Sequence, residues 1–296
     1  MICAIPLAAL CVLAADRRKC AGFVIQSHRG AGNLAPDNSM PAFEMGWRMG
    51  TIPEADPRTT RDGVLVAFHD NDLKRLAPDA DPAIRDKSVN DLDWEVVSKL
   101  DTGSYFDPKY AGIHIPRISD ILDRMRGRPE RRLYLDVKKL PLNELAALVR
   151  EAGVERQVIM ASTKYDEIRD WKRLLPDSGT LHWLGDPEPR LEERLAELRS
   201  AGFEDITQLQ IHVRVGCFDA LGTTDDPFAP SSKFLRETMT EVRAKGILFQ
   251  VLVIGSKDPR AYEKLMDLGI DSFATDDPLV TLDVMRRRLT KRSPER

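Results

Sequence analysis

The chain has 296 residues, of which 42% are hydrophobic and 31% are charged. This composition supports a substantial core and excludes a disordered or fibrous protein. The 44 lysines and arginines nearly balance the 47 acidic residues, giving a net charge of −3, so the overall charge does not favour nucleic acid as a partner. The basic tail, residues 286–292, follows a helical pattern and is interpreted as a solvated end.

An apolar stretch, residues 2–15, precedes Asp16 and three basic residues. It is shorter than the roughly 20 residues of a membrane-spanning helix. Its length and its small-residue end are typical of a secretory signal peptide over residues 1–15, although no Lys or Arg precedes it. We expect a secreted or periplasmic protein without stable membrane insertion. The alternative is a cytoplasmic protein whose N-terminal segment caps the fold.

The four cysteines are too few for a disulfide scaffold, and they form no Cys-x-x-Cys zinc pattern. Cys3 and Cys11 would leave with a signal peptide. Cys20 and Cys217 would then remain, and they could pair in an oxidising compartment if the fold brings them close enough.

Short β-rich runs alternate with amphipathic helical patterns after the N-terminal stretch. The predicted strands are Gly22–Ser27, Ile52–Asp56, Leu65–His69, Arg132–Lys138, Gln157–Ala161, Thr180–Leu184, Thr207–Val213, Ile247–Ile254 and Ser272–Thr275. The predicted helices are Leu142–Glu151, Tyr165–Leu175, Leu191–Ala201, Lys233–Lys245 and Arg260–Leu268. All but the second stop at a glycine, which accepts the left-handed backbone that ends many helices.

Repeated strand–helix units indicate a parallel sheet with helical crossovers. Because no domain break interrupts them, we predict a single TIM (β/α)8 barrel over residues 20–290. Residues 71–117 break the pattern, since they are rich in Asp and Pro and carry the aromatic residues Trp94 and Tyr105-Phe106. They are predicted to be a small insertion between the second and third barrel strands. It could shape substrate access or be a purely structural loop.

Residues that can carry chemistry follow the first predicted strand, in the run Ser27-His28-Arg29-Gly30. In a TIM barrel the C-terminal ends of the strands hold the active site. Histidine exchanges protons near neutral pH, and arginine presents a planar fork that suits phosphate. A single histidine at a strand end is more often structural than catalytic, so this run alone is a weak signal.

Two acidic residues, Glu54 and Asp56, close the next predicted strand between Pro53 and Pro57. Because side chains alternate along a strand, both carboxylates point to one face, roughly 6.6 Å apart along the chain. They would repel each other unless a cation lies between them, and oxygen ligands suit Mg²⁺ or Ca²⁺. The alternative is a solvated acidic strand end.

Two later strand ends extend this set. His69 closes the strand Leu65–His69, and the adjacent Asp70 could orient its imidazole. Asp136 and Lys138 share a face at the end of another strand, where they could supply a further metal ligand and a cation for phosphate. Two proton carriers, three carboxylates and two cations are what metal-assisted phosphoryl transfer requires.

In this order the motifs resemble those of the glycerophosphodiester phosphodiesterases, a family of TIM barrels. The matching runs are His28-Arg29-Gly30, Pro36-Asp37-Asn38-Ser39, Ala42-Phe43, Glu54-Ala55-Asp56, Thr60-Arg61-Asp62-Gly63, His69-Asp70, Leu135-Asp136-Val137-Lys138, Gly269-Ile270-Asp271 and Thr275-Asp276-Asp277-Pro278. The resemblance extends from Phe23 to Pro278 and is densest up to Asp70.

The resemblance implies a role for each candidate residue. The general acid/base pair would be His28 and His69. The divalent metal, Ca²⁺ or Mg²⁺, would be held by Glu54, Asp56 and Asp136. The phosphate oxygens would be held by Arg29 and Lys138.

Among the departures from the family pattern, two bear on the metal and the substrate. Asp136 stands where the family usually has a glutamate, so the metal geometry could shift or a water could intervene. Gln250, in the seventh predicted barrel strand, stands where the family often has a tryptophan near the substrate. This change puts the family's usual substrate contact in doubt, and it bears less on the acid/base and metal residues.

The reaction implied is metal-dependent hydrolysis of a small-molecule glycerophosphodiester to glycerol 3-phosphate and an alcohol. The attacking group could be water or the substrate's own glycerol hydroxyl. The alternatives are a phosphodiesterase acting on lysophospholipids or other phosphodiesters, and a barrel that binds phosphorylated ligands without turnover. The sequence indicates no oligomeric state. The remaining histidines and two tryptophans are interpreted as loop, core or packing residues: His114, His182, His212, Trp171 and Trp183.

Overall fold

The computed structural model describes residues 23–216 and 226–292. The apolar stretch at residues 2–15 lies outside these ranges, as do Cys20 and Cys217, so the signal peptide and the disulfide stay predictions. Within the described ranges, no helix combines the length and the apolar character needed to cross a membrane.

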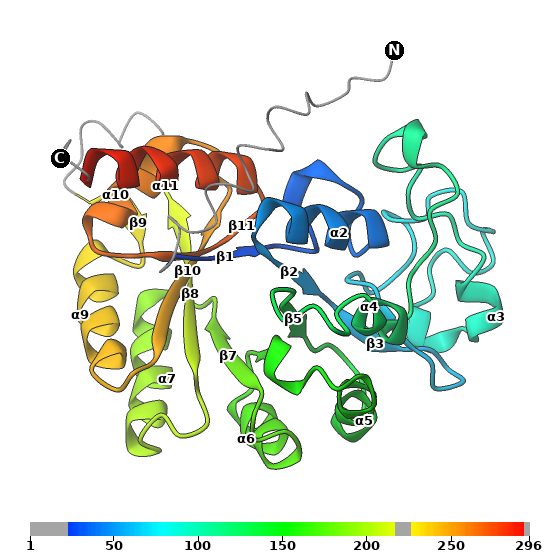
Figure 1. Ribbon diagram of the computed structural model, residues 1–296, viewed down its shortest axis with the longest axis horizontal. Coiled ribbons are helices and arrows are strands. Elements are labelled where there is room, and N and C mark those ends of the chain that lie inside the picture. Colours follow the sequence, from blue (N-terminus) through cyan, green and yellow to red (C-terminus); the bar gives the residue numbers. More distant parts are fainter. Residues whose placement is uncertain (1–22, 217–225, 293–296) are drawn as a thin grey trace.

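Parallel strands close into a barrel, which confirms the predicted TIM (β/α)8 fold (Figure 1). In order around the barrel the strands are β1 (Val24–Ser27), β2 (Ile52–Ala55), β5 (Leu133–Asp136), β6 (Val158–Ser162), β7 (Gly179–Leu184), β8 (Gln208–Val215), β10 (Leu248–Ile254) and β11 (Ser272–Thr275). The circle closes because β11 pairs with both β10 and β1, and β10 also pairs with β8. A short strand, β9 (Phe228–Ala229), adds to β8 in antiparallel orientation.

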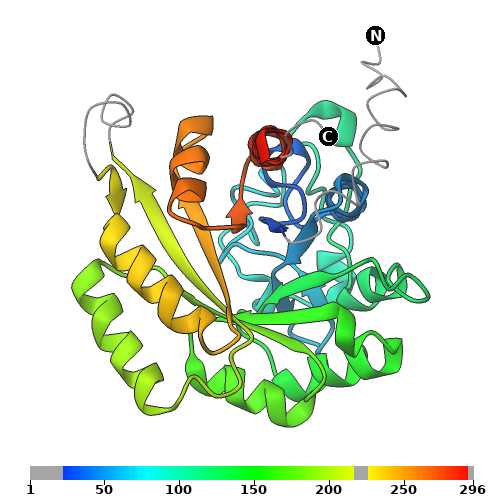
Figure 2. The same ribbon diagram turned by 60° about the vertical axis from the view of Figure 1, so that its left-hand side comes forward.

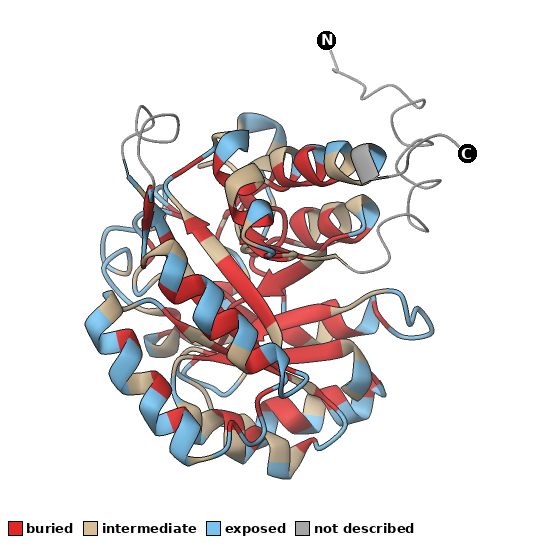
Figure 3. Ribbon diagram, turned by 90° about the vertical axis from the view of Figure 1, so that its left-hand side faces the viewer, coloured by how far each residue is buried: buried red, intermediate tan, exposed pale blue. Residues whose placement is uncertain are grey.

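Helices surround the barrel (Figure 2), with their buried residues toward the sheet and their exposed residues toward solvent (Figure 3). They are α2 (Met40–Met49), α4 (Ile118–Asp123), α5 (Leu142–Ala152), α6 (Tyr165–Leu174), α7 (Glu188–Ser200), α9 (Ser232–Arg243), α10 (Pro259–Asp267) and α11 (Pro278–Arg292). The glycine stop predicted for α5 is confirmed, since Gly153 caps it at a φ of 66°. Trp171 of α6 is fully buried, as expected for a packing residue.

The prediction that Leu65–His69 is a strand of the barrel is wrong. This part of the chain forms β4 (Leu65–Ala67), which pairs in antiparallel orientation with β3 (Pro57–Thr59) in a separate two-stranded sheet. The physical reason is the short turn between the two strands, because a parallel neighbour would need a crossover of a dozen or more residues. His69 therefore reaches the barrel from a hairpin that leaves β2 directly after Asp56.

The insertion between the second and third barrel strands, β2 and β5, is confirmed, and the hairpin forms its base. Residues 71–117 lie beside the barrel, at the right in Figure 1, and include α3 (Trp94–Val97). The segment has its own apolar core, which includes Leu73, Leu76 and Phe68. It is therefore packed independently of the main barrel core.

The barrel interior contains a polar network, and Gln250 of β10 belongs to it. Gln250 is fully buried, donates to Ser272 Oγ at 3.1 Å and accepts from Gln210 Nε2 at 2.5 Å. Tyr134 of β5 donates to Gln208 Oε1 at 2.7 Å in the same region. Because interior partners enclose Gln250, the structure agrees with the doubt about a substrate contact at this position.

The loop after β1 packs tightly against the end of β11. His28 N donates to Thr275 O at 3.1 Å, and Asn33 N donates to Asp276 O at 2.7 Å. Gly32 lies between these contacts at a φ of 58°, and a Cβ built there would lie 2.1 Å from Asp276 O. The absence of a side chain at Gly32 thus allows the ends of the first and eighth barrel strands to approach each other.

We predict that Gly32→Ala destabilises the fold more than Gly153→Ala. Both glycines have left-handed φ values, 58° and 66°, but a Cβ at Gly153 meets nothing within 4 Å. The control, Gly153→Ala, should lower the free energy of unfolding only by the roughly 1–2 kcal/mol that this backbone conformation costs an alanine. Gly32→Ala should lose a further 1–3 kcal/mol or so through overpacking. Urea unfolding would measure the free energy of unfolding of both variants. Equal decreases would contradict the tight contact with Asp276.

Candidate active site

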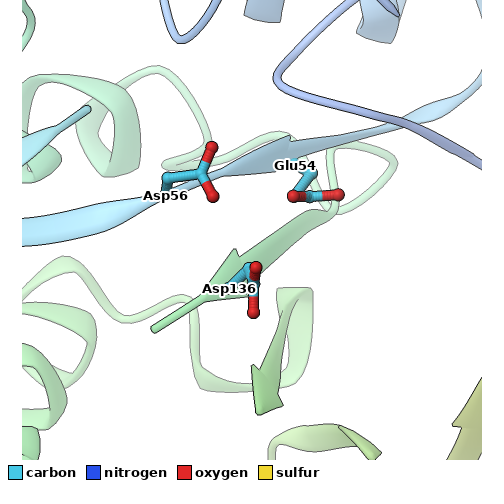
Figure 4. A group of neighbouring side chains, drawn as sticks. All are labelled: Glu54, Asp56 and Asp136. Carbon is cyan, nitrogen blue, oxygen red and sulfur yellow. The ribbon is translucent and has the colours of Figure 1, made fainter. Parts of the chain in front are cut away.

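Three carboxylates meet at the C-terminal ends of two neighbouring strands (Figure 4). Glu54 lies on β2, Asp56 directly follows it, and Asp136 ends β5. One carboxylate oxygen of each lies within 4.8 Å of the others. All three residues are buried, so the sequence prediction that these acids gather in one place is confirmed.

Each of the three carboxylates is held by a neutral N–H donor. Gln26 Nε2 donates to Glu54 Oε2. Asn38 Nδ2 donates to Asp56 Oδ2 at 2.7 Å, and Trp183 Nε1 donates to Asp136 Oδ1 at 3.0 Å. In this way one oxygen of every carboxylate is fixed by the protein.

The three acids fit a divalent cation. Asp56 Oδ1 is buried and accepts no hydrogen bond, although Lys138 Nζ lies 2.9 Å away. Burial raises the pKa of Glu54 and that of Asp136, because the low-dielectric surroundings disfavour their charged forms. The ammonium group of Lys138 pairs with only two of the three carboxylates, those of Asp56 and Asp136. An all-oxygen donor set suits Mg²⁺ or Ca²⁺.

Lys138 lies among the acidic residues. The sequence placed it on one face with Asp136 but did not predict its ion pair with Asp56. Its ammonium group forms ion pairs with Asp56 Oδ1 at 2.9 Å and with Asp136 Oδ2. Burial opposes its charge, but Asp56 and Asp136 outweigh that effect and raise the pKa of Lys138. The two carboxylates therefore favour the charged form of Lys138.

His28 lies between two carboxylates. Its Nδ1 is 2.6 Å from Asp276 Oδ1, at the end of β11, and its Nε2 is 3.9 Å from Glu54 Oε1. Burial disfavours the imidazolium form, but Glu54 and Asp276 outweigh it and raise the pKa of His28 to about 9. Sequence reasoning quoted Asp276 only as part of a motif and missed this contact. Its place directly after the last strand was the available signal.

His69 makes two hydrogen bonds that fix its tautomer. Its Nδ1 is 2.9 Å from Asp70 Oδ1, which confirms that Asp70 orients the ring. Its Nε2 is 3.1 Å from Arg29 Nη2. Because arginine can only donate, Nε2 is the acceptor and Nδ1 carries the proton.

Arg29 occupies a strained position, with a φ of 52°. Its Nη1 donates to Asp37 Oδ2 at 2.9 Å. Its Nε is buried and has no hydrogen-bond partner in the described part of the chain. Such an unpaired buried donor is costly to a protein, and an anionic ligand would satisfy it.

Asn38 is a site residue that sequence reasoning did not assign. It also has a left-handed φ, 53°, which asparagine tolerates better than most residues. Its Oδ1 accepts from Asp56 N at 2.8 Å, and its own N donates to Arg29 O at 2.9 Å. It therefore ties Arg29 to Asp56, and its place in the Pro36–Ser39 motif was the signal that could have identified it.

The interpretation of Trp183 as a packing residue is incomplete. Besides holding Asp136, its ring stacks on His212 with centroids 4.9 Å apart and planes 4° apart. The interpretation of His182 as a core residue agrees with the structure. Burial and Arg194 lower the pKa of His182 to about 4, so its ring is neutral.

All seven residues singled out from the sequence thus come together. Burial opposes the charge of Asp56, yet Lys138 and the hydrogen bond from Asn38 hold the pKa of this carboxyl well below its usual range.

Comparisons with known proteins identify the family. The model of the glycerophosphoryl diester phosphodiesterase family matches residues 28–280. A glycerophosphodiester phosphodiesterase of Caldanaerobacter subterraneus is 24% identical over 276 residues, covering 89% of this chain and 98% of the relative.

Two solved structures share the barrel fold. A glycerophosphodiester phosphodiesterase of Agrobacterium tumefaciens has a TM-score of 0.66 at 22% identity, covering 88% of this chain and 98% of its own. A phosphodiesterase of Oleispira antarctica, in complex with the product sn-glycerol-3-phosphate, has a TM-score of 0.66 at 20% identity, covering 90% and 99%. Since the family model spans nearly all of the described barrel, the chain belongs to the glycerophosphoryl diester phosphodiesterase family.

Proposed function

We propose that this protein hydrolyses glycerophosphodiesters to glycerol 3-phosphate and an alcohol. The observation that carries the proposal is the meeting of two imidazoles, each with its own carboxylate partner, at one buried acidic group. A binding protein for phosphorylated ligands would need no such pair of proton carriers. The product bound to the Oleispira relative, sn-glycerol-3-phosphate, supports the same reaction.

Glu54, Asp56 and Asp136 would hold a divalent cation, Ca²⁺ or Mg²⁺. When bound, the cation supplies positive charge that stabilises the nonbridging oxygens of the phosphate. Arg29 would hold the phosphate through its buried Nε, which lacks a hydrogen-bond partner in the described ranges. Lys138 would contribute its charge from among the acidic residues, where it pairs with Asp56.

The hydrogen bonds distinguish the two histidines. His69 Nε2 is an acceptor with Asp70 behind it, so we assign His69 as the general base. The attacking hydroxyl would take the place of Arg29 as the donor to Nε2 before it gives up its proton. His28 lies between Glu54 and Asp276, which favour its imidazolium form. We assign it as the general acid toward the departing alcohol. The assignment of base and acid is the same whether the attacking group is water or the substrate's own glycerol hydroxyl.

The first test compares substrates. The proposal expects release of glycerol 3-phosphate from glycerophosphocholine in the presence of Mg²⁺ or Ca²⁺. Faster turnover of lysophosphatidylcholine would instead favour a lysophospholipid as substrate. Binding of glycerol 3-phosphate without turnover of either diester would contradict an enzymatic role.

We predict that His28→Ala lowers kcat on glycerophosphocholine by about 10²–10⁴-fold, the usual contribution of a general acid. His114→Ala is the matched control, since His114 hydrogen-bonds Leu100 O at 2.9 Å in the insertion. Thermal unfolding would verify that both variants fold. Turnover by His28→Ala comparable with that of the control would remove His28 from the mechanism.

We also predict that Glu54→Gln weakens binding of Mg²⁺ or Ca²⁺ by at least about 10-fold, the loss caused by removing even an outer partner of a metal ligand. Calorimetric titration of the free protein would measure it without any substrate. Glu44→Gln is the control, because Glu44 on α2 pairs with Arg131 at 2.8 Å, away from the acidic group. Equal affinities in the two variants would argue against Glu54 as a ligand.

A further inference from the structure

A closed network of five side chains joins His69 and Arg29 to the insertion. Its contacts, in order, are His69 Nδ1 to Asp70 Oδ1 (2.9 Å), Asp70 Oδ2 to Arg75 Nε (2.7 Å), Arg75 Nη1 to Asp37 Oδ2 (2.9 Å), Asp37 Oδ2 to Arg29 Nη1 (2.9 Å), and Arg29 Nη2 back to His69 Nε2 (3.1 Å). We call it the five-residue network. Every member is therefore held from two sides.

Arg75 is the member that the insertion contributes. Its Nε and Nη2 bind both oxygens of Asp70 at 2.7 Å, and its Nη1 binds Asp37. A planar guanidinium can make these contacts at once, whereas a lysine ammonium offers one point charge. The side chains of Asp70 and Asp37 are only 18% and 14% exposed, so their ion pairs are screened less than those of a typical surface pair.

The insertion holds Arg75 in place by two means. Leu73 and Leu76, which flank it in the chain, are buried in the insertion's own core. Tyr105 lies beside it, with the guanidinium carbon 5.9 Å from the ring centroid. The Tyr105 hydroxyl also accepts from Asp37 N at 2.8 Å, so the insertion contacts the network at a second point.

We propose that Arg75 is a positioning residue, and that the insertion orients the His69 imidazole and the Arg29 guanidinium through Arg75 and Tyr105. This inference rests on the proposed function, in which His69 and Arg29 act on the substrate. Without Arg75, Asp70 loses its bidentate partner and is no longer held against His69 Nδ1. Asp37 then keeps Arg29 as its remaining arginine partner in the network.

The test uses the full chain with Arg75→Ala and, as a matched control, Arg61→Ala. Arg61 forms a comparable bidentate pair with Asp93, at 2.8 and 2.5 Å, and this pair also connects the hairpin to the insertion. It has no contact with the five-residue network among the interactions described. The two variants therefore remove the same chemical group from the same region.

We expect Arg75→Ala to lower kcat on glycerophosphocholine by about 10²-fold, the cost of misplacing a catalytic group by roughly 1 Å, with little change in KM. Arg61→Ala should keep the wild-type kcat. Added guanidinium ion should restore part of the activity of Arg75→Ala, because the Arg75 side chain is 44% exposed and its site opens to solvent. It should not raise the activity of Arg61→Ala.

A second measurement is independent of turnover. The ¹⁵N NMR signals of the His69 ring should show one tautomer, protonated at Nδ1, in the wild type and a mixture of tautomers in Arg75→Ala. Arg75→Lys keeps the charge but not the planar guanidinium, so its His69 tautomer population should lie between those of the wild type and Arg75→Ala. This variant provides the test if the alanine variant does not fold.

Either of two results would overturn the inference: a kcat in both Arg75 variants equal to that of Arg61→Ala, or a His69 tautomer that does not change. Failure of the proposed function would differ from both, because the wild-type protein would then release no product while the NMR comparison would still report on the network.

Discussion

Electrostatic repulsion among three buried carboxylates is the constraint on which the rest of the site depends. Glu54, Asp56 and Asp136 lie within a few ångströms of one another, where water cannot screen them. The surrounding structure offsets this cost with the ammonium group of Lys138 and with N–H donors from three different elements. A fold that assembled these acids without such partners would expel or neutralise one of them.

The barrel brings the acids together, and the insertion completes the site. Parallel strands end on one side of a barrel, so β1, β2, β5 and β11 deliver their terminal residues to the same place. His69 arrives differently, from a hairpin that folds back beside the end of β2, where Phe68 N donates to Asp56 O at 2.9 Å. The catalytic pair we assign thus comes from two structural units that pack separately.

Much of this organisation could be predicted from the sequence, because it depends on local signals. Alternating strand and helix patterns with glycine stops indicated the barrel, and the two-residue spacing of Glu54 and Asp56 placed both on one face. The strand ends indicated the seven candidate residues, and the family resemblance implied a role for each. The strand Leu65–His69 was assigned to the barrel because its short apolar run is equally typical of a barrel strand and of a hairpin strand. The short turn at Asp62-Gly63 was the signal that distinguishes them.

Other features depend on contacts between distant parts of the chain and could not be predicted. Asp276 is 248 positions away from His28, and Trp183 is 47 away from Asp136. No local pattern specifies such a pair. Arg75 resembled any other charged residue of an irregular segment, since only the folded insertion brings it to Asp37 and Asp70.

The N–H donors on the acidic residues have a consequence for coordination. Gln26, Asn38 and Trp183 each donate to one oxygen of a carboxylate, and Lys138 pairs with the other oxygen of Asp56 and of Asp136. A cation held by these acids would therefore have to share these oxygens with the ammonium group of Lys138 or displace it. Mg²⁺ and Ca²⁺ take about six or more oxygen ligands. Three carboxylates would leave part of such a shell to solvent or to a phosphate oxygen.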